Sequence, residues 1–120
     1  MENNSTGGFW VDFLEYQDKS MKTDTKVVIN DNRIAFYALG IADEAGEVAG
    51  KIKKLIREKN SVLTEDYKKE IVKELGDVLW YMTQMCTYMN VSLEDVAKSS
   101  IEKIMSRQER GKLFGNGDNR

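Results

Sequence analysis

The 120-residue chain contains no histidine, no proline and a single cysteine. Without histidine it cannot build histidine-based zinc sites, Ser-His-Asp or Cys-His nucleophile systems, or the Glu-x-x-His ligands of ferritin-like di-iron bundles. Any catalysis must instead use carboxylates, lysine, arginine, tyrosine or a bound metal ion. Cys86 has no partner for an internal disulfide, which fits a reducing compartment, so we expect a cytoplasmic protein.

Long apolar runs and a strong charge imbalance are also missing. No apolar run reaches membrane-spanning length, and the polar first eight residues lack the apolar region of a signal peptide. The net charge of −2 argues against a dedicated nucleic-acid binder. We therefore expect no membrane partner and no nucleic-acid partner.

Helices are favoured because proline is absent and β-branched runs are sparse. Apolar residues recur at helical spacing in four segments, at about residues 9–20, 31–59, 64–89 and 93–109. Short loops between long amphipathic helices predict an all-α fold, an antiparallel four-helix bundle-like protomer. A flexible tail at 1–8, one helical domain at 9–110 and a glycine-rich tail at 111–120 complete the expected organisation. The expected N-caps are Asn30 or Asp31, Thr64 and Ser92.

The second and third helices each carry an apolar seam with steps of three and four residues. The first seam contains Ile34, Ala38, Ile41, Ala45, Val48, Ile52 and Leu55. The second contains Ile71, Leu75, Val78, Met82 and Met85. We expect the two seams to pack against each other.

Two acidic pairs flank these seams, Glu44 with Glu47 and Glu74 with Asp77. Residues three apart share a helix face, with Cβ atoms about 5–6 Å apart. Like charges at that distance repel by roughly 3 kcal/mol per pair at an effective dielectric near 20. A hard divalent cation removes this cost, because such ions prefer oxygen ligands. The sequence therefore predicts a cation site between the two helices.

Gly46 and Gly76 occupy matching places inside the two acidic motifs. Glycine costs about 1 kcal/mol relative to alanine within a helix, so the pair predicts close approach of the two backbones there. A single acidic pair is usually only a solvated helix face, but the repeated arrangement favours a site.

The two acidic motifs with their flanks, residues 39–48 and 73–81, resemble the MazG family of nucleoside triphosphate pyrophosphohydrolases. The family motif is Glu-Glu-x-x-Glu followed by Glu-x-x-Asp, and Asp43 stands here in place of the first glutamate. The similarity extends through Lys103, Arg107 and Arg110 to the tail at 115–120. The implied reaction is attack of water on the α-phosphorus, which gives a nucleoside monophosphate and pyrophosphate.

The resemblance also implies a set of site residues. It assigns Mg²⁺, or Mn²⁺ in its place, and the catalytic role to Glu44, Glu47, Glu74 and Asp77. The phosphates need cations, and the candidates by spacing are Lys51, Lys54, Lys103, Arg107 and Arg110. Tyr81 follows Asp77 by four residues and is a candidate for sugar contact. Weaker candidates for base contact are Trp10, Phe13 and Gln17.

Two other functions remain open at this point. The chain would also fit a non-catalytic helical oligomerisation module with a structural cation, or a base-specific dUTPase or dCTPase with the same chemistry.

The third helix has a broad apolar face that includes Leu79 and Trp80, and one partner helix cannot cover all of this face. We therefore expect a homodimer or homotetramer that binds a nucleoside triphosphate.

Overall fold

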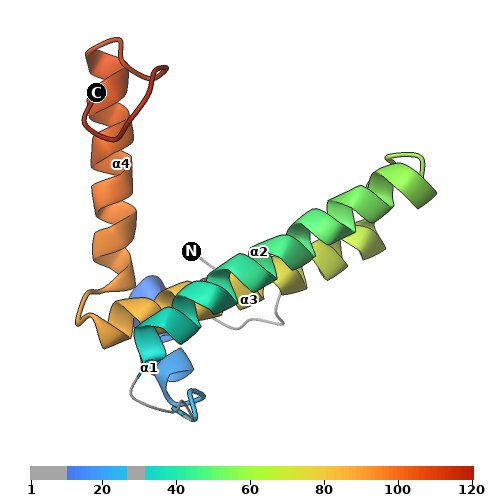
Figure 1. The fold of residues 1–120 in the computed structure, drawn as a ribbon, viewed down its shortest axis with the longest axis horizontal. Coiled ribbons are helices and arrows are strands. Elements are labelled where there is room, and N and C mark those ends of the chain that lie inside the picture. The colour runs from blue at the N-terminus through green and yellow to red at the C-terminus, as the bar shows by residue number, and fades with distance from the viewer. Residues whose placement is uncertain (1–10, 27–31) are drawn as a thin grey trace.

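The computed structural model describes residues 11–26 and 32–120, and over these ranges it contains helices and no strand. The helices are α1 (Phe13–Met21), α2 (Arg33–Glu58), α3 (Glu65–Tyr88) and α4 (Leu93–Glu109), as Figure 1 shows. The predicted all-α class is confirmed. Trp10 and the candidate caps Asn30 and Asp31 lie outside the described residues. No helix in the described ranges is both long and apolar enough to cross a membrane.

Side-chain caps start three of the helices. The side chains of Asp12, Thr64 and Ser92 accept hydrogen bonds from the backbone N–H of Glu15, Tyr67 and Asp95, at 2.8, 3.2 and 2.9 Å. The caps predicted at Thr64 and Ser92 are confirmed. Asn90, which follows α3, has a φ of 57°, and this left-handed conformation ends the helix before α4 begins.

Helices α2 and α3 form a long antiparallel hairpin, and α1 packs against α3 near the open end of that hairpin (Figure 1). Helix α4 contacts α1 at the same end and then extends away from the hairpin. In the described part of the chain the four helices therefore do not lie side by side as the sequence led us to expect. Hydrogen bonds from α1 to the connection between α3 and α4 fix the direction in which α4 leaves the hairpin.

The faces of α2 and α3 that meet include only part of each predicted seam. Three residues that we placed in the seams, Ile34, Ile52 and Leu75, are 41%, 39% and 50% exposed. The other predicted seam residues that are buried or half-buried are Ile41, Val48 and Leu55 on α2 and Ile71, Val78, Met82 and Met85 on α3. Tyr37 and Glu44 on α2 and Tyr67 and Glu74 on α3 are also buried or half-buried. Consequently Glu44 and Glu74 belong to the contact between the helices and do not merely flank it.

The two helices approach each other closely at Gly40. A Cβ atom on Gly40 would lie 2.2 Å from Cδ1 of Tyr81, so the tyrosine ring of α3 packs directly on the glycine backbone of α2. A Cβ atom on Gly46 or Gly76 would meet nothing within 4 Å. The prediction of close approach at Gly46 and Gly76 is therefore wrong, because both glycines lie on exposed faces of their helices.

Replacement of Gly40 by alanine should destabilise the hairpin, because the new methyl group overlaps the Tyr81 ring. Overpacking of this kind costs about 1–3 kcal/mol, and we expect thermal denaturation to show a melting temperature several degrees lower. Gly50→Ala is the matched control, since nothing lies within 4 Å of its Cβ position. This control should be neutral or slightly stabilising. Equal melting temperatures for the two variants would contradict the packing of Tyr81 on Gly40.

Candidate functional site

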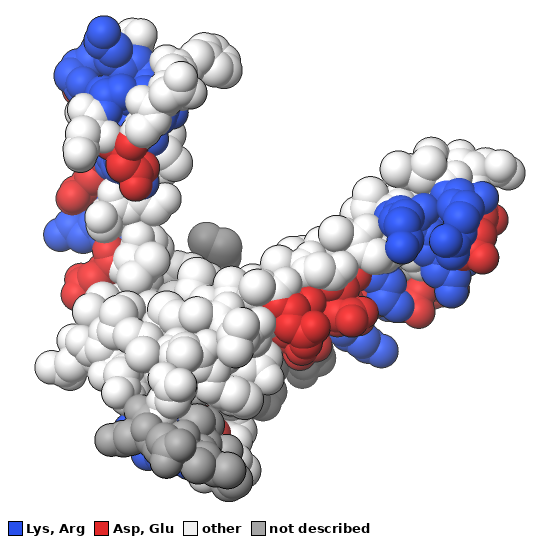
Figure 2. All heavy atoms as spheres, viewed as in Figure 1, with Lys and Arg blue, Asp and Glu red and all other residues white. Residues whose placement is uncertain are grey.

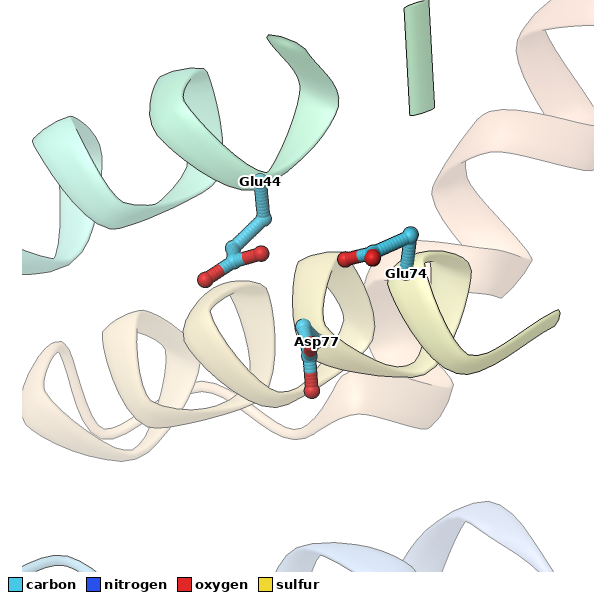
Figure 3. Close-up of side chains that lie close together, drawn as sticks. All are labelled: Glu44, Glu74 and Asp77. Carbon is cyan, nitrogen blue, oxygen red and sulfur yellow. The ribbon is translucent and has the colours of Figure 1, made fainter. Parts of the chain in front are cut away.

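Three carboxylates from α2 and α3 meet at the middle of the hairpin. One oxygen of each of Glu44, Glu74 and Asp77 lies within 4.8 Å of the other two (Figure 3). Oxygens that bind one Mg²⁺ or Ca²⁺ at about 2.0–2.6 Å stand up to roughly 4–5 Å apart. The three oxygens are therefore spaced as ligands of a single cation. Figure 2 shows acidic side chains gathered over this part of the hairpin.

The charge of this cluster is not balanced within the described residues. Partial burial raises the pKa of the Glu44 carboxyl above its ordinary value, and the negative charges of Asp77, Asp43, Glu74 and Glu47 raise it further. None of the three clustered carboxylates forms an ion pair or accepts a side-chain hydrogen bond in residues 11–26 and 32–120. The folded chain therefore disfavours the charged form of Glu44 unless a cation binds.

Glu47 is the fourth carboxylate that the sequence suggested. It lies one turn beyond Glu44 on α2 and is exposed, and its oxygens are not part of the three-oxygen group. Its charge still acts on Glu44 and raises the pKa of that carboxyl. Glu47 is thus close to the cluster without belonging to it.

Lys51 and Lys54 lie farther along α2, toward the tip of the hairpin where Figure 2 shows basic side chains. Lys51 is half-buried, its Nζ is 3.7 Å from a carboxylate oxygen of Glu70, and its carbonyl accepts a 2.6 Å hydrogen bond from the Tyr67 hydroxyl. Lys54 is exposed and has no ion-pair partner among the described residues. Lys51 is seven residues from Glu44, which is about 10 Å along the helix.

Tyr81 lies inside the hairpin. Its ring covers Gly40 and packs edge-on against Phe36 with ring centroids 5.9 Å apart. The side chain is half-buried, so its main role in this structure is packing between α2 and α3.

The basic residues of α4 bind the chain's own tail. The Arg107 side chain is 9% exposed, and its Nη2 donates to the Asp118 carbonyl at 2.7 Å and to the Asp118 carboxylate at 3.3 Å. Lys103 lies 3.3 Å from the same carboxylate, and Arg110 donates to the Arg120 carbonyl. Hydrogen bonds from Lys103 and Arg107 lower the pKa of Asp118.

These contacts place the α4 cations apart from the acidic cluster. Figures 1 and 2 show the basic end of α4 well separated from the acidic part of the hairpin within one chain. The structure therefore brings together three of the four predicted carboxylates, but it does not bring Lys103, Arg107 or Arg110 to them.

The Gln17 side chain is engaged in hydrogen bonds within the chain, so it is not free to contact a base. Its Nε2 donates to the Thr87 hydroxyl and the Val91 carbonyl at 3.1 and 3.0 Å, and its Oε1 accepts from the backbone N–H of Leu93 at 2.8 Å. One side chain on α1 thus fixes the connection between α3 and α4. Phe13 is 46% exposed on the same helix.

Tyr16 on α1 is a neighbour of the site that sequence reasoning missed. Burial raises the pKa of its hydroxyl, and the negative charge of Asp77 raises it further. No spacing in the sequence connects Tyr16 with Asp77, because their proximity depends on how α1 docks on α3.

Comparisons with known proteins match the part of the chain that carries the cluster. The profile of the MazG nucleotide pyrophosphohydrolase domain matches residues 34–111, which include all three clustered carboxylates. The "Gene 37 protein" of Mycobacterium phage L5 is 39% identical over 87 residues, which cover 72% of this chain and 76% of that protein. No solved structure matches the chain.

Removal of the Glu44 charge should stabilise the chain in the absence of cations. Because the folded state raises the pKa of Glu44, its charged form opposes folding above the ordinary pKa, and Glu44→Gln removes that opposition. We expect the variant to melt at a higher temperature than the parent chain in chelator, and Mg²⁺ to raise the melting temperature of the parent much more than that of the variant.

Lys103 and Arg107 provide the contrasting case at Asp118, where removal of a carboxylate charge deletes favourable contacts. Asp118→Asn should therefore not raise the melting temperature in chelator. The cation site would be contradicted if the parent chain and Glu44→Gln had the same melting temperature in chelator and Mg²⁺ did not change the melting temperature of the parent.

Proposed function

The chain belongs to the MazG nucleotide pyrophosphohydrolase family, and on that premise we propose that it hydrolyses ribo- or deoxyribonucleoside triphosphates to the monophosphate and pyrophosphate. The observation that carries the proposal is the convergence of Glu44, Glu74 and Asp77 at the middle of the hairpin. A triphosphate cannot approach three uncompensated carboxylates, so the same groups must act through a cation.

We assign Mg²⁺ to Glu44, Glu74 and Asp77, with Mn²⁺ as a substitute. The donor set fits, since it offers only carboxylate oxygens and their spacing matches one hard cation. When bound, the cation would neutralise phosphate charge and lower the pKa of a water molecule.

Glu47 is the group that we assign to accept the proton. It lies one turn from Glu44 and its carboxylate is outside the three-oxygen group, so it stays available when the other three bind a cation. The water oxygen forms a bond to the α-phosphorus, and the bond from that phosphorus to the oxygen bridging the β-phosphate breaks. The proton passes to Glu47 and pyrophosphate leaves.

Lys51 and Lys54 are the cations of the same chain that we assign to the β- and γ-phosphates. They continue along α2 beyond the acidic cluster, and Lys54 carries no ion pair in the described residues. In one chain Lys103, Arg107 and Arg110 are far from this point, so they join the site only when α4 comes from another copy.

Assembly into a homodimer or homotetramer is therefore part of the proposal. Large apolar side chains are at least half exposed on all four helices, namely Leu14, Leu39, Ile56, Val72, Leu75, Ile101 and Met105. Exposed apolar surface of this extent usually marks an interface, and two-fold association is the commonest way to cover it.

Pyrophosphate release with Mg²⁺ tests the reaction. We expect nucleoside monophosphate and pyrophosphate as products, no turnover in chelator, and ¹⁸O from labelled water on the monophosphate. Nucleoside diphosphate and orthophosphate as products would show that a different bond is cleaved.

Two variants separate cation binding from proton transfer. Glu74→Gln should weaken Mg²⁺ binding and remove turnover. Glu47→Gln should keep Mg²⁺ binding, measured by calorimetry, and lower kcat by about 10²–10⁴-fold, the usual contribution of a general base. Glu102→Gln, an exposed carboxylate of α4, is the control and should retain both properties. Full turnover by Glu47→Gln would refute its assigned role.

Light scattering tests the assembly. We expect a mass that is two or four times 13.7 kDa. Leu75→Glu should lower it, because Leu75 is half exposed on α3 and is not needed for packing within one chain. Lys69→Glu, an exposed polar position on the same helix, should leave the mass unchanged. An active particle of 13.7 kDa would contradict the proposed assembly.

A further inference from the structure

A hollow of about 240 Å³ lies at the open end of the hairpin, where the chain leaves α1, α2 begins and α3 ends. Its surface is mostly polar, and its lining includes Asp24, Lys26, Arg33, Tyr37, Thr87 and Tyr88. The volume is below the range of about 300–1,000 Å³ typical of sites for drug-sized ligands. The hollow therefore has room for a small molecule or an ion.

This hollow is separate from the carboxylate cluster. Tyr37 lies seven residues before Glu44 on α2, and Thr87 lies ten residues after Asp77 on α3. These separations correspond to about 10 and 15 Å along the helix axes. Between the two places, the tyrosine ring of α3 that packs on Gly40 fills the space between the helices. The proposed hydrolysis therefore does not account for a polar hollow at this end of the hairpin.

Two cationic side chains of the lining form no ion pair among residues 11–26 and 32–120. The first is Arg33, which is half-buried and lies over the Tyr88 ring, with its Cζ 4.9 Å from the ring centroid. The second is Lys26, which is exposed. An aromatic ring under a guanidinium leaves the N–H donors at the edge of the guanidinium plane, and these donors match the paired oxygens of a phosphate or a carboxylate.

The carboxylate of Asp24 is the one negative charge among the described residues of the lining. One of its oxygens accepts a hydrogen bond from the Tyr37 hydroxyl, and the other accepts one from the backbone N–H of Lys26 at 3.0 Å. Burial, followed by the hydrogen bond to Asp24, raises the pKa of Tyr37 to about 12, so this hydroxyl stays neutral. The lining therefore carries two positive charges against one negative charge whose oxygens are already bound.

A neutral donor on α3 completes the set. The Thr87 hydroxyl accepts a hydrogen bond from Nε2 of Gln17 at 3.1 Å, and its own proton is bound to no other described residue. The hollow thus offers hydrogen-bond donors from three segments of the chain, namely Lys26 after α1, Arg33 on α2 and Thr87 on α3.

We propose that this hollow binds a small oxyanion, whose phosphate or carboxylate oxygens accept hydrogen bonds from Arg33, Lys26 and Thr87. The anion neutralises the two cations and connects the segment after α1 to the hairpin. Hydrogen bonds between charged groups are roughly twice as strong as neutral ones, so Arg33 contributes most of the affinity. Because the hollow is separate from the carboxylate cluster, the anion binds there without a divalent cation.

Calorimetry in chelator tests this site, with inorganic phosphate, pyrophosphate and citrate as separate probes. Without a divalent cation the carboxylate cluster repels anions, so it does not contribute to binding. At least one probe should bind the parent chain, and Arg33→Ala should weaken that binding roughly 10- to 100-fold, because a charged hydrogen-bond donor is lost. Lys26 is exposed, so Lys26→Ala removes the second cation without a change in packing and should also weaken binding. Failure of all three probes to bind at millimolar concentration would overturn the inference.

Three variants are controls for the position of the anion. Arg57→Ala on α2 and Lys22→Ala after α1 each remove an exposed cation outside the hollow, so both should keep the parent affinity. Glu74→Gln alters the carboxylate cluster and should keep it as well, which makes this test independent of the proposed hydrolysis. A loss of anion binding in Glu74→Gln, or an equal loss in Arg33→Ala and Arg57→Ala, would place the anion elsewhere and contradict the proposal.

The same probes identify the class of anion. Binding of phosphate or pyrophosphate without citrate assigns phosphate chemistry, binding of citrate alone assigns carboxylates, and either result supports the site. Thermal denaturation in the same buffers adds a second readout, because a ligand that binds only the folded chain raises its melting temperature. The rise should be present in the parent chain and absent in Arg33→Ala. An equal rise in both would show that the anion does not bind at Arg33.

Discussion

Repulsion among three carboxylates in the contact between α2 and α3 is the constraint on which the rest of the structure depends. Glu44 and Glu74 occupy positions where an apolar side chain would pack, and Asp77 adds a third charge at the edge. Like charges about 5 Å apart repel by roughly 3 kcal/mol per pair at an effective dielectric near 20, although solvent screens exposed Asp77 more strongly. This repulsion is large compared with a typical free energy of unfolding of about 5–15 kcal/mol. A cation bound between the carboxylates would remove the repulsion and join α2 to α3.

The remainder of the hairpin compensates for that contact with aromatic packing on both sides of it. Tyr81 lies on Gly40 toward the open end, and buried Tyr67 reaches across to the Lys51 carbonyl toward the tip. The fixed helices hold the carboxylates at cation spacing even though the charges repel. Basic side chains gather at the hairpin tip and on α4 (Figure 2), so the net charge of −2 hides a strong separation of charge.

Local features could be predicted from the sequence, and features that depend on docking could not. Thr64 and Ser92 predict the starts of α3 and α4, because an N-cap hydrogen bond joins residues only three apart in the sequence. The apolar period shows that α2 is amphipathic, but both Ile34 and Tyr37 fit a stripe, and only packing decides that Tyr37 is inside and Ile34 is 41% exposed. The direction of α4 likewise depends on Gln17, a single polar side chain that no periodic pattern reveals.

A crystal structure with Mn²⁺, phased on the anomalous signal of the metal, tests the central claim most directly. The account predicts an anomalous peak within bonding distance of carboxylate oxygens from Glu44, Glu74 and Asp77, with α2 and α3 held together by the ion. The peak should disappear in crystals of Glu74→Gln. A Mn²⁺ peak elsewhere on the chain, or carboxylates that turn away from one another with no metal between them, would contradict the account.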